Sequence, residues 1–219
     1  MHEHEMSDDD NEKEATLAGV IEANARPWNG YWAWKDKPVG EHGAAHEILT
    51  GAGIPFEGLV SRDQGQDPPD CEAKIDGQRV GIEITELVHQ RTMERSLRAQ
   101  RERARGQEPE KEEVYFVWDR AKLLQHLQDR IDAKDRAEPK GGPYSRYFLV
   151  IHTDEMFLDA AQVDEWLTGA TFRANRITDA LLGLSYHPAH NGSPVFRLRL
   201  CARDRESQGP YYGDLSAAG

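Results

Sequence analysis

An α/β fold with a mixed central β-sheet flanked by helices is predicted by three observations on the 219-residue sequence. Residues 121–137 place leucine and isoleucine at helical spacing, which is typical of a helix packed on a sheet. Residues 147–152 form a short apolar run of the kind buried inside a sheet. Asp76-Gly77 lies between two segments of alternating hydrophobicity, which is a strong signal for a β-hairpin.

The N-terminal half of the fold is predicted to contain two helices followed by three strands. The first helix covers residues 17–25 and ends before Pro27, and the second covers residues 41–52 and ends at glycines near its C-cap. Strands are expected where apolar and polar residues alternate, at residues 56–62, 71–75 and 78–87. A long polar helix is expected after the third strand.

The C-terminal half is predicted to alternate helices with strands. After the helix at 121–137 and the strand at 147–152, two further helices are expected at residues 161–167 and 173–182. Strands at the remaining apolar segments, residues 184–187 and 195–201, would then close the sheet.

Half of the net negative charge lies outside the predicted fold. The sequence holds 27 basic and 39 acidic residues, a formal net charge of −12. The first fourteen residues contain seven acids and one lysine, so they carry −6, and they have no aromatic or β-branched residue to bury. We therefore expect a disordered acidic tail at residues 1–15, a single domain at residues 16–202 and a weakly ordered tail at residues 203–219.

The composition excludes an integral membrane protein. No apolar run approaches the ~18 residues that a transmembrane helix needs, so we expect no membrane partner. The N-terminus lacks the apolar core of a signal peptide, so we expect a cytoplasmic protein whose cysteines, Cys71 and Cys201, are reduced.

A nucleic-acid partner is disfavoured by net charge but is not excluded by it. A charge of −12 counts against non-specific coating of DNA or RNA. Six arginines nevertheless lie close together, at positions 91, 95, 98, 101, 103 and 105. The Arg91–Arg105 region is therefore either a basic strip for a nucleic-acid backbone or a solvated helix face.

The predicted hairpin places two carboxylates side by side. A two-residue turn at Asp76-Gly77 fixes the register so that Asp70 faces Glu83. The Cβ atoms of opposed residues lie about 4.5–5.5 Å apart, so the two like charges would repel each other. Full solvation, a shared proton or a hard divalent cation could offset that repulsion.

These residues resemble the motif of a known superfamily. Pro69-Asp70 and Gly81-Ile82-Glu83-Ile84-Thr85, with twelve residues between Asp70 and Glu83, are similar to the core of the PD-(D/E)XK phosphodiesterases, which include restriction endonucleases and related repair and defence nucleases. The resemblance covers about half of the chain. It implies a restriction-endonuclease-like three-layer core and an endonuclease that hydrolyses DNA or RNA with Mg²⁺ or Mn²⁺.

The resemblance also assigns roles to particular residues. Asp70 and Glu83 would be metal ligands, and Ile84 would offer its backbone carbonyl as a further ligand. The first helix of the superfamily core often contributes a glutamate. Glu47 is the candidate for that glutamate in this chain, and Glu41 is a weaker one.

The lysine of the motif is missing from its usual place. It should fall at residue 85, where Thr85 cannot supply a positive charge to a reacting phosphate. Lys134 is a candidate replacement, because it follows Leu127 and Ile131 on the apolar stripe of the helix at 121–137. The alternative is a lysine that extends from the end of the helix into water.

Two functions stay open on the sequence, and the oligomeric state is not indicated. The first is a Mg²⁺-dependent nuclease, whose catalytic residues would be Asp70, Glu83, Lys134 and Glu47. The second is a non-catalytic binding or regulatory module that keeps the fold without the lysine, as Thr85 suggests. A zinc hydrolase that uses His42 and His46 is a third and weaker hypothesis, since no zinc signature accompanies the pair.

Overall fold

The structure is a computed structural model that describes residues 37–63, 65–88, 102, 105–106, 117–155, 158–184 and 193–203. The chain divides into two compact units, Met1–Gly40 with Val88–Val117 and Glu41–Leu87 with Trp118–Gly219. The second unit holds the described sheets and almost all of the described helices. The predictions for the acidic tail, the helix at 17–25, the arginines before Arg105 and the C-terminal tail beyond Arg203 lie outside the described residues.

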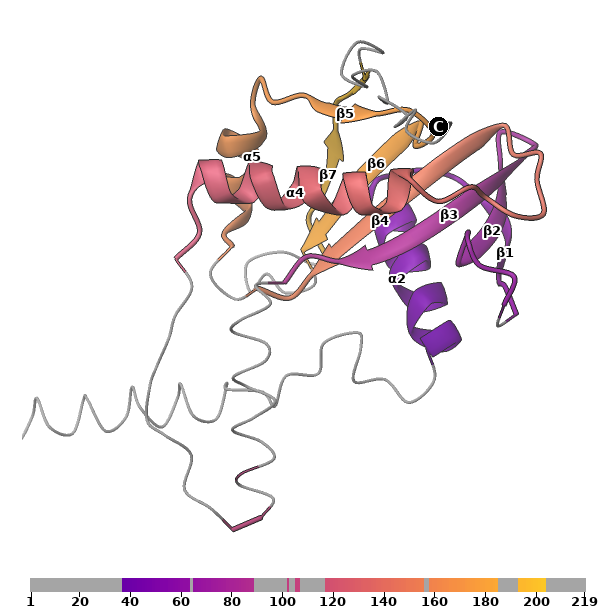
Figure 1. Cartoon of the computed structure of the whole chain (residues 1–219), viewed down its shortest axis with the longest axis horizontal. Coiled ribbons are helices and arrows are strands. Elements are labelled where there is room, and N and C mark those ends of the chain that lie inside the picture. Colours follow the sequence, from indigo (N-terminus) through magenta and orange to yellow (C-terminus); the bar gives the residue numbers. More distant parts are fainter. Residues whose placement is uncertain are drawn as a thin grey trace, which may run out of the picture. The chain divides into compact units, whose positions relative to one another are not determined.

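A six-stranded mixed sheet forms the centre of the second unit (Figure 1). Its strands, in spatial order, are β1 (Glu57–Ser61), β2 (Cys71–Ile75), β3 (Gln78–Glu86), β4 (Arg146–Thr153), β6 (Asp179–Leu184) and β7 (Val195–Leu198). The β3–β4 and β4–β6 pairs are parallel, and the other pairs are antiparallel. A separate parallel pair consists of β5 (Phe172–Ala174) and β8 (Leu200–Ala202). The predicted mixed α/β architecture is confirmed.

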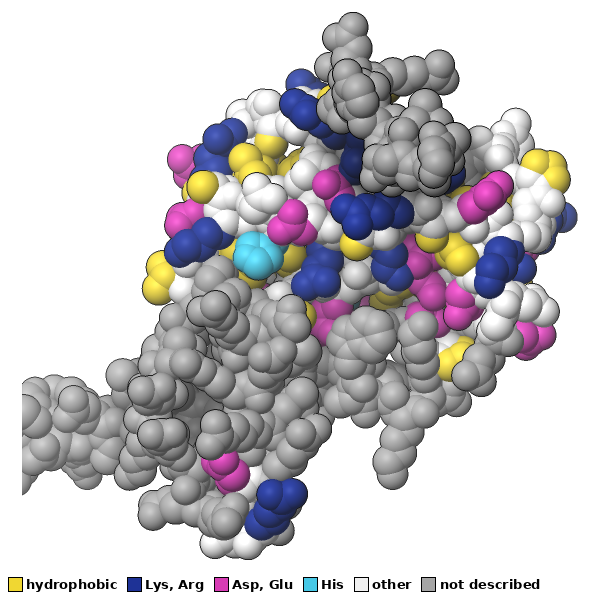
Figure 2. Space-filling model, viewed as in Figure 1, with side chains coloured by type: hydrophobic (Ala, Val, Ile, Leu, Met, Phe, Trp, Pro, Cys, Tyr) yellow, Lys and Arg dark blue, Asp and Glu magenta, His cyan; other side chains and the backbone are white. Residues whose placement is uncertain are grey.

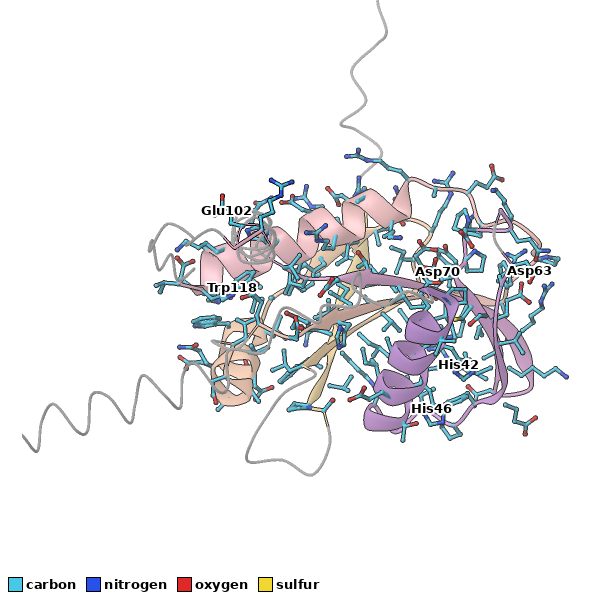
Figure 3. The ribbon with its side chains drawn as sticks, turned by 90° about the horizontal axis from the view of Figure 1, so that it is seen from below. His42, His46, Asp63, Asp70, Glu102 and Trp118 are labelled. Carbon is cyan, nitrogen blue, oxygen red and sulfur yellow. The ribbon has the colours of Figure 1, made fainter. Side chains whose placement is uncertain are left out.

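Two helices lie on opposite faces of the sheet, and Figure 3 shows the sheet between them. They are α2 (Lys37–Gly51) and α4 (Arg120–Asp135), and a shorter helix is α5 (Ala160–Leu167). Helix α4 begins at an N-cap, Asp119, whose carboxylate accepts the amide N–H of Lys122, and it buries Leu123, Leu127 and Ile131. None of the helices in the described part of the chain is long and apolar enough to span a bilayer.

The β2–β3 hairpin has the predicted turn and register. Asp76 and Gly77 both have positive φ, 54° and 72°, as a type I′ turn requires. The paired residues run from Ile75 opposite Gln78 to Cys71 opposite Ile82. The predicted register is confirmed for these five pairs, and one residue further along Asp70 accepts the amide N–H of Ile84, next to Glu83.

The prediction of a helix at residues 173–182 is wrong. Strands β5 and β6 cover most of that range, and β6 lies between β4 and β7 inside the sheet. The connecting backbone is held by the buried carboxylate of Asp135, which accepts the amide N–H groups of residues 175, 176 and 177. A short apolar run has no periodicity that separates a buried strand from a buried helix. The strand predicted at 184–187 correspondingly ends at Leu184, and residues 185–187 lie outside the described residues.

Close packing of α2 on the sheet predicts that Gly183→Ala destabilises the protein. A Cβ at residue 183 would lie 2.6 Å from both Cγ1 and Cδ1 of Ile48, a side chain that is 1% exposed. We expect a loss of about 1–3 kcal/mol in the free energy of unfolding, measured by urea titration. The control is Gly43→Ala in α2, where a Cβ would meet nothing within 4 Å and should stabilise the helix. An unchanged stability for Gly183→Ala would contradict this packing.

Candidate functional site

Three buried carboxylates come together where the β2–β3 hairpin meets α2. Asp70 immediately precedes β2, Glu83 lies in β3 and Glu41 lies in α2, and their exposed fractions are 4%, 5% and 5%. Glu41 and Asp70 share a hydrogen bond between their side chains. Figure 2 shows acidic side chains gathered beside the C-terminal end of α4, next to lysine or arginine side chains.

The backbone on both sides of Asp70 is fixed by hydrogen bonds. Its Oδ2 atom accepts the amide N–H of Ile84 at 2.8 Å, which ties the side chain to β3. Its carbonyl accepts the N–H of Arg62 at 2.9 Å, and the carbonyl of Pro68 accepts the N–H of Lys140 at 2.7 Å. The carboxylate of Asp70 is therefore held against Glu83 by contacts to three separate segments.

Each carboxylate oxygen of Glu83 has a hydrogen-bond donor, and the two donors are Lys134 and Tyr147. The Lys134 ammonium lies 2.5 Å from Oε1, and the Tyr147 hydroxyl donates to Oε2 at 3.1 Å. Lys134 follows Leu127 and Ile131 on the buried side of α4, as the sequence predicts, and its side chain is 29% exposed. The structure thus brings Asp70, Glu83 and Lys134 together although Lys134 is 51 residues from Glu83.

Glu41 and Glu83 hold their protons to a higher pH than glutamate ordinarily does. Burial, followed by the charge of Asp70 and the hydrogen bond to it, raises the pKa of Glu41 to about 8. Burial and the Asp70 charge also raise the pKa of Glu83, against the opposite effect of Lys134. Three anionic carboxylates in this space would need more compensation than one ammonium gives, so a proton or a further cation is required there.

Glu47 does not lie with these residues, and Glu41 takes the place predicted for it. Glu47 is exposed and its Oε1 atom accepts a hydrogen bond from the hydroxyl of Ser193. Six residues along a helix amount to about 240° of rotation, so the two glutamates point to different sides of α2. The signal that favours Glu41 over Glu47 is its helical spacing from Ala45 and Ile48, which are 0% and 1% exposed.

Two other residues of the motif are buried in β3. The amide of Ile84 binds Asp70, and the predicted role of its carbonyl as a metal ligand stays a prediction. Thr85, at the motif's lysine position, is 6% exposed and pairs with Ile151 of β4. A longer cationic side chain at this position would have to displace buried neighbours.

The histidine pair makes contacts within the fold. The Nε2 atom of His42 lies 3.2 Å from the carbonyl oxygen of Leu59, and the ring of His46 packs edge-on against Phe56. Figure 3 shows Asp70 at the sheet and both histidines along α2. Across the described ranges, no group of three or more histidine, cysteine, aspartate and glutamate side chains has a geometry that could hold a metal ion.

A fourth buried acid, Glu86, lies near the end of β3. It is 2% exposed, and neither of its carboxylate oxygens has a hydrogen-bond partner among the residues that the structure describes. Burial, and then the charge of Asp154, raise its pKa to about 8. Burial lowers the pKa of His152, which is opposite Glu86 on β4.

The raised pKa of Glu41 predicts a stability that falls as pH rises. The folded chain binds a proton at Glu41 that the unfolded chain releases near the ordinary value of 4.5. That contribution is complete below about pH 4.5 and is lost as pH approaches 8, with Glu86 acting in the same direction. The free energy of unfolding of the wild type should therefore fall between pH 6 and pH 9. In Glu41→Gln, which has no proton to release, the fall over the same range should be smaller by about 1–3 kcal/mol.

Urea unfolding at the two pH values measures this difference, and Glu47→Gln is the matched control on the same helix. Its carboxylate is exposed, so its removal should leave the pH dependence as in the wild type. Equal pH dependence for wild type and Glu41→Gln would show that Glu41 holds no proton at neutral pH.

Comparisons of the chain with protein-family models, with curated proteins and with solved structures give no match.

Proposed function

We propose that the protein is a metal-dependent nuclease of the PD-(D/E)XK type, which hydrolyses phosphodiester bonds of DNA or RNA. One observation carries the proposal: Lys134 lies 2.5 Å from Glu83 in a site that also contains Asp70, although the motif position holds Thr85. A lysine from another element thus supplies the positive charge that the motif lacks. A lysine extending into water at the end of α4 would not make this contact.

The arrangement of elements supports the same assignment. The resemblance implies the order helix, three strands, helix and strand. In this chain the order is α2, the antiparallel strands β1 to β3, α4 and the parallel strand β4. Helices α2 and α4 cover opposite faces of the sheet, as in a restriction-endonuclease-like three-layer core (Figures 1 and 3).

The carboxylate oxygens of the site are the type of ligand that a hard divalent cation prefers, although the described residues contain no preformed group of three side chains around a metal position. Asp70 and Glu83 offer buried carboxylate oxygens, and burial and the charge of Asp70 raise the pKa of the neighbouring Glu41 to about 8. Asp70 and Glu83 would hold Mg²⁺ or Mn²⁺, with the Ile84 carbonyl as a further ligand and Glu41 as the supporting acid in place of Glu47. When bound, such an ion polarises the phosphate and lowers the pKa of a coordinated water.

The chain's own residues have separate tasks in this proposal. The Ile84 amide and the Tyr147 hydroxyl hold the two motif acids in place. The Lys134 ammonium stabilises negative charge that develops on the phosphate oxygens during hydrolysis. The Arg91–Arg105 region, most of which lies outside the described residues, would hold the nucleic-acid backbone.

Asp70→Asn and Lys134→Met are each expected to lower metal-dependent cleavage by about 10²-fold or more, because each removes charge from the reacting centre. The assay follows cleavage of duplex DNA, single-stranded DNA and RNA with Mg²⁺ or Mn²⁺. Lys122→Met is the control, since Lys122 lies on the same helix but pairs with Asp119. Cleavage by Asp70→Asn at the wild-type rate would assign the activity to a contaminant and remove the proposal.

A non-catalytic binding module is the alternative, and the buried Thr85 at the lysine position favours it. A binding module would retain nucleic acid on a filter while no substrate is cut with either metal ion. In that case Asp70→Asn would bind as the wild type does. Cleavage that depends on both Asp70 and Lys134 excludes this alternative.

A further inference from the structure

We propose that Tyr147 is a positioning residue of this site: its hydroxyl fixes Glu83 in the orientation that binds the divalent cation. The inference rests on the proposed function, because it concerns the same carboxylate. It adds a residue that belongs to no part of the Asp70 to Thr85 motif and that lies on a different strand.

Two donors on different elements hold the carboxylate of Glu83. Its Oε2 atom accepts the hydroxyl of Tyr147 at 3.1 Å, and its Oε1 atom lies 2.5 Å from the Lys134 ammonium. One donor comes from β4 and the other from α4, so the plane of the carboxylate is defined by two elements. A glutamate on a strand otherwise has several side-chain rotamers, and the charge of Asp70 would favour those that point away from it.

The absence of a side chain at Gly81 lets Tyr147 reach this carboxylate. Tyr147 pairs with Gly81 in the parallel β3–β4 register, and its ring lies over the glycine. A Cβ at residue 81 would lie 3.0 Å from Cδ2 of the ring and 3.1 Å from Cγ of Pro69. The missing side chain of Gly81 therefore provides the space in which the ring contacts the hairpin, two residues before Glu83.

The hydroxyl of Tyr147 is a buried and uncharged donor. Tyr147 is 4% exposed, and its hydroxyl donates to Oε2 of Glu83. Because it is uncharged, it orients Glu83 without neutralising it, which leaves the negative charge for the cation. This distinguishes its effect from that of Lys134.

Tyr147→Phe tests the proposal, because it keeps the ring and removes only the donor. We expect Mn²⁺ affinity, measured by calorimetry on the full chain, to fall by about 10–100-fold, as for other residues that orient metal ligands. The Mg²⁺ concentration that gives half-maximal cleavage should rise by a similar factor. The control is Tyr144→Phe, which loses a hydroxyl bonded to Glu72 and should leave Mn²⁺ affinity unchanged.

Gly81→Ala gives a second and independent readout. The added methyl group should displace the ring of Tyr147 and weaken Mn²⁺ binding in the wild-type background. In the Tyr147→Phe background the same substitution should have no further effect on affinity, because the hydroxyl through which it acts is gone. Additive losses would mean that Gly81 acts on the site by another route and would overturn this part of the proposal.

The outcomes separate this inference from the proposed function. A wild-type protein that binds Mn²⁺ and cleaves nucleic acid, with Tyr147→Phe equal to it in affinity and in Mg²⁺ requirement, overturns the role of Tyr147 alone. A wild-type protein that neither binds Mn²⁺ nor cleaves overturns both. A loss of affinity in Tyr147→Phe, with the urea midpoint of Tyr144→Phe and Tyr147→Phe alike, supports a positioning role over a general loss of stability.

Discussion

The two-residue turn at Asp76-Gly77 is the constraint on which the site depends. Its positive φ angles fix the register of β2 against β3, and a shift by one residue would turn every side chain of the hairpin to the opposite face. With the observed register, Asp70 reaches the amide of Ile84 beside Glu83. Asp76 and Gly77 lie six residues along the strands from Asp70 and Glu83, so the turn acts on the site through strand geometry.

The remaining features of the site compensate the negative charge that this register concentrates. The raised pKa of Glu41 keeps a proton on that acid at neutral pH, and the Lys134 ammonium pairs with Glu83, while the Tyr147 hydroxyl orients Glu83 without neutralising it. The cost of burying like charges without partners would be several kcal/mol. These three groups come from α2, α4 and β4, so three elements converge on this end of the hairpin.

Local signals in the sequence account for what could be predicted. The hairpin, the helix that carries Lys134 and the apolar strand β4 each have a periodicity or a turn signature of their own. Tyr147 has no such signal, because its importance follows from the parallel register that places it over Gly81. The choice of Glu41 over Glu47 depends on which side of α2 faces the sheet. Strand β6 is predicted as helix because a short apolar run is compatible with a buried strand and with a buried helix.

The Lys134 ammonium comes from α4 and not from the hairpin, which has a consequence for how the site is assembled during folding. Asp70 and Glu83 are joined by a hairpin and become neighbours through contacts that are close in sequence. Lys134, 51 residues from Glu83, joins them only after a long loop has closed, which is a slow and non-local event. The hairpin alone therefore carries two like charges without their counter-charge, so an isolated hairpin would be more stable at mildly acidic pH, where the acids are protonated, than at neutral pH.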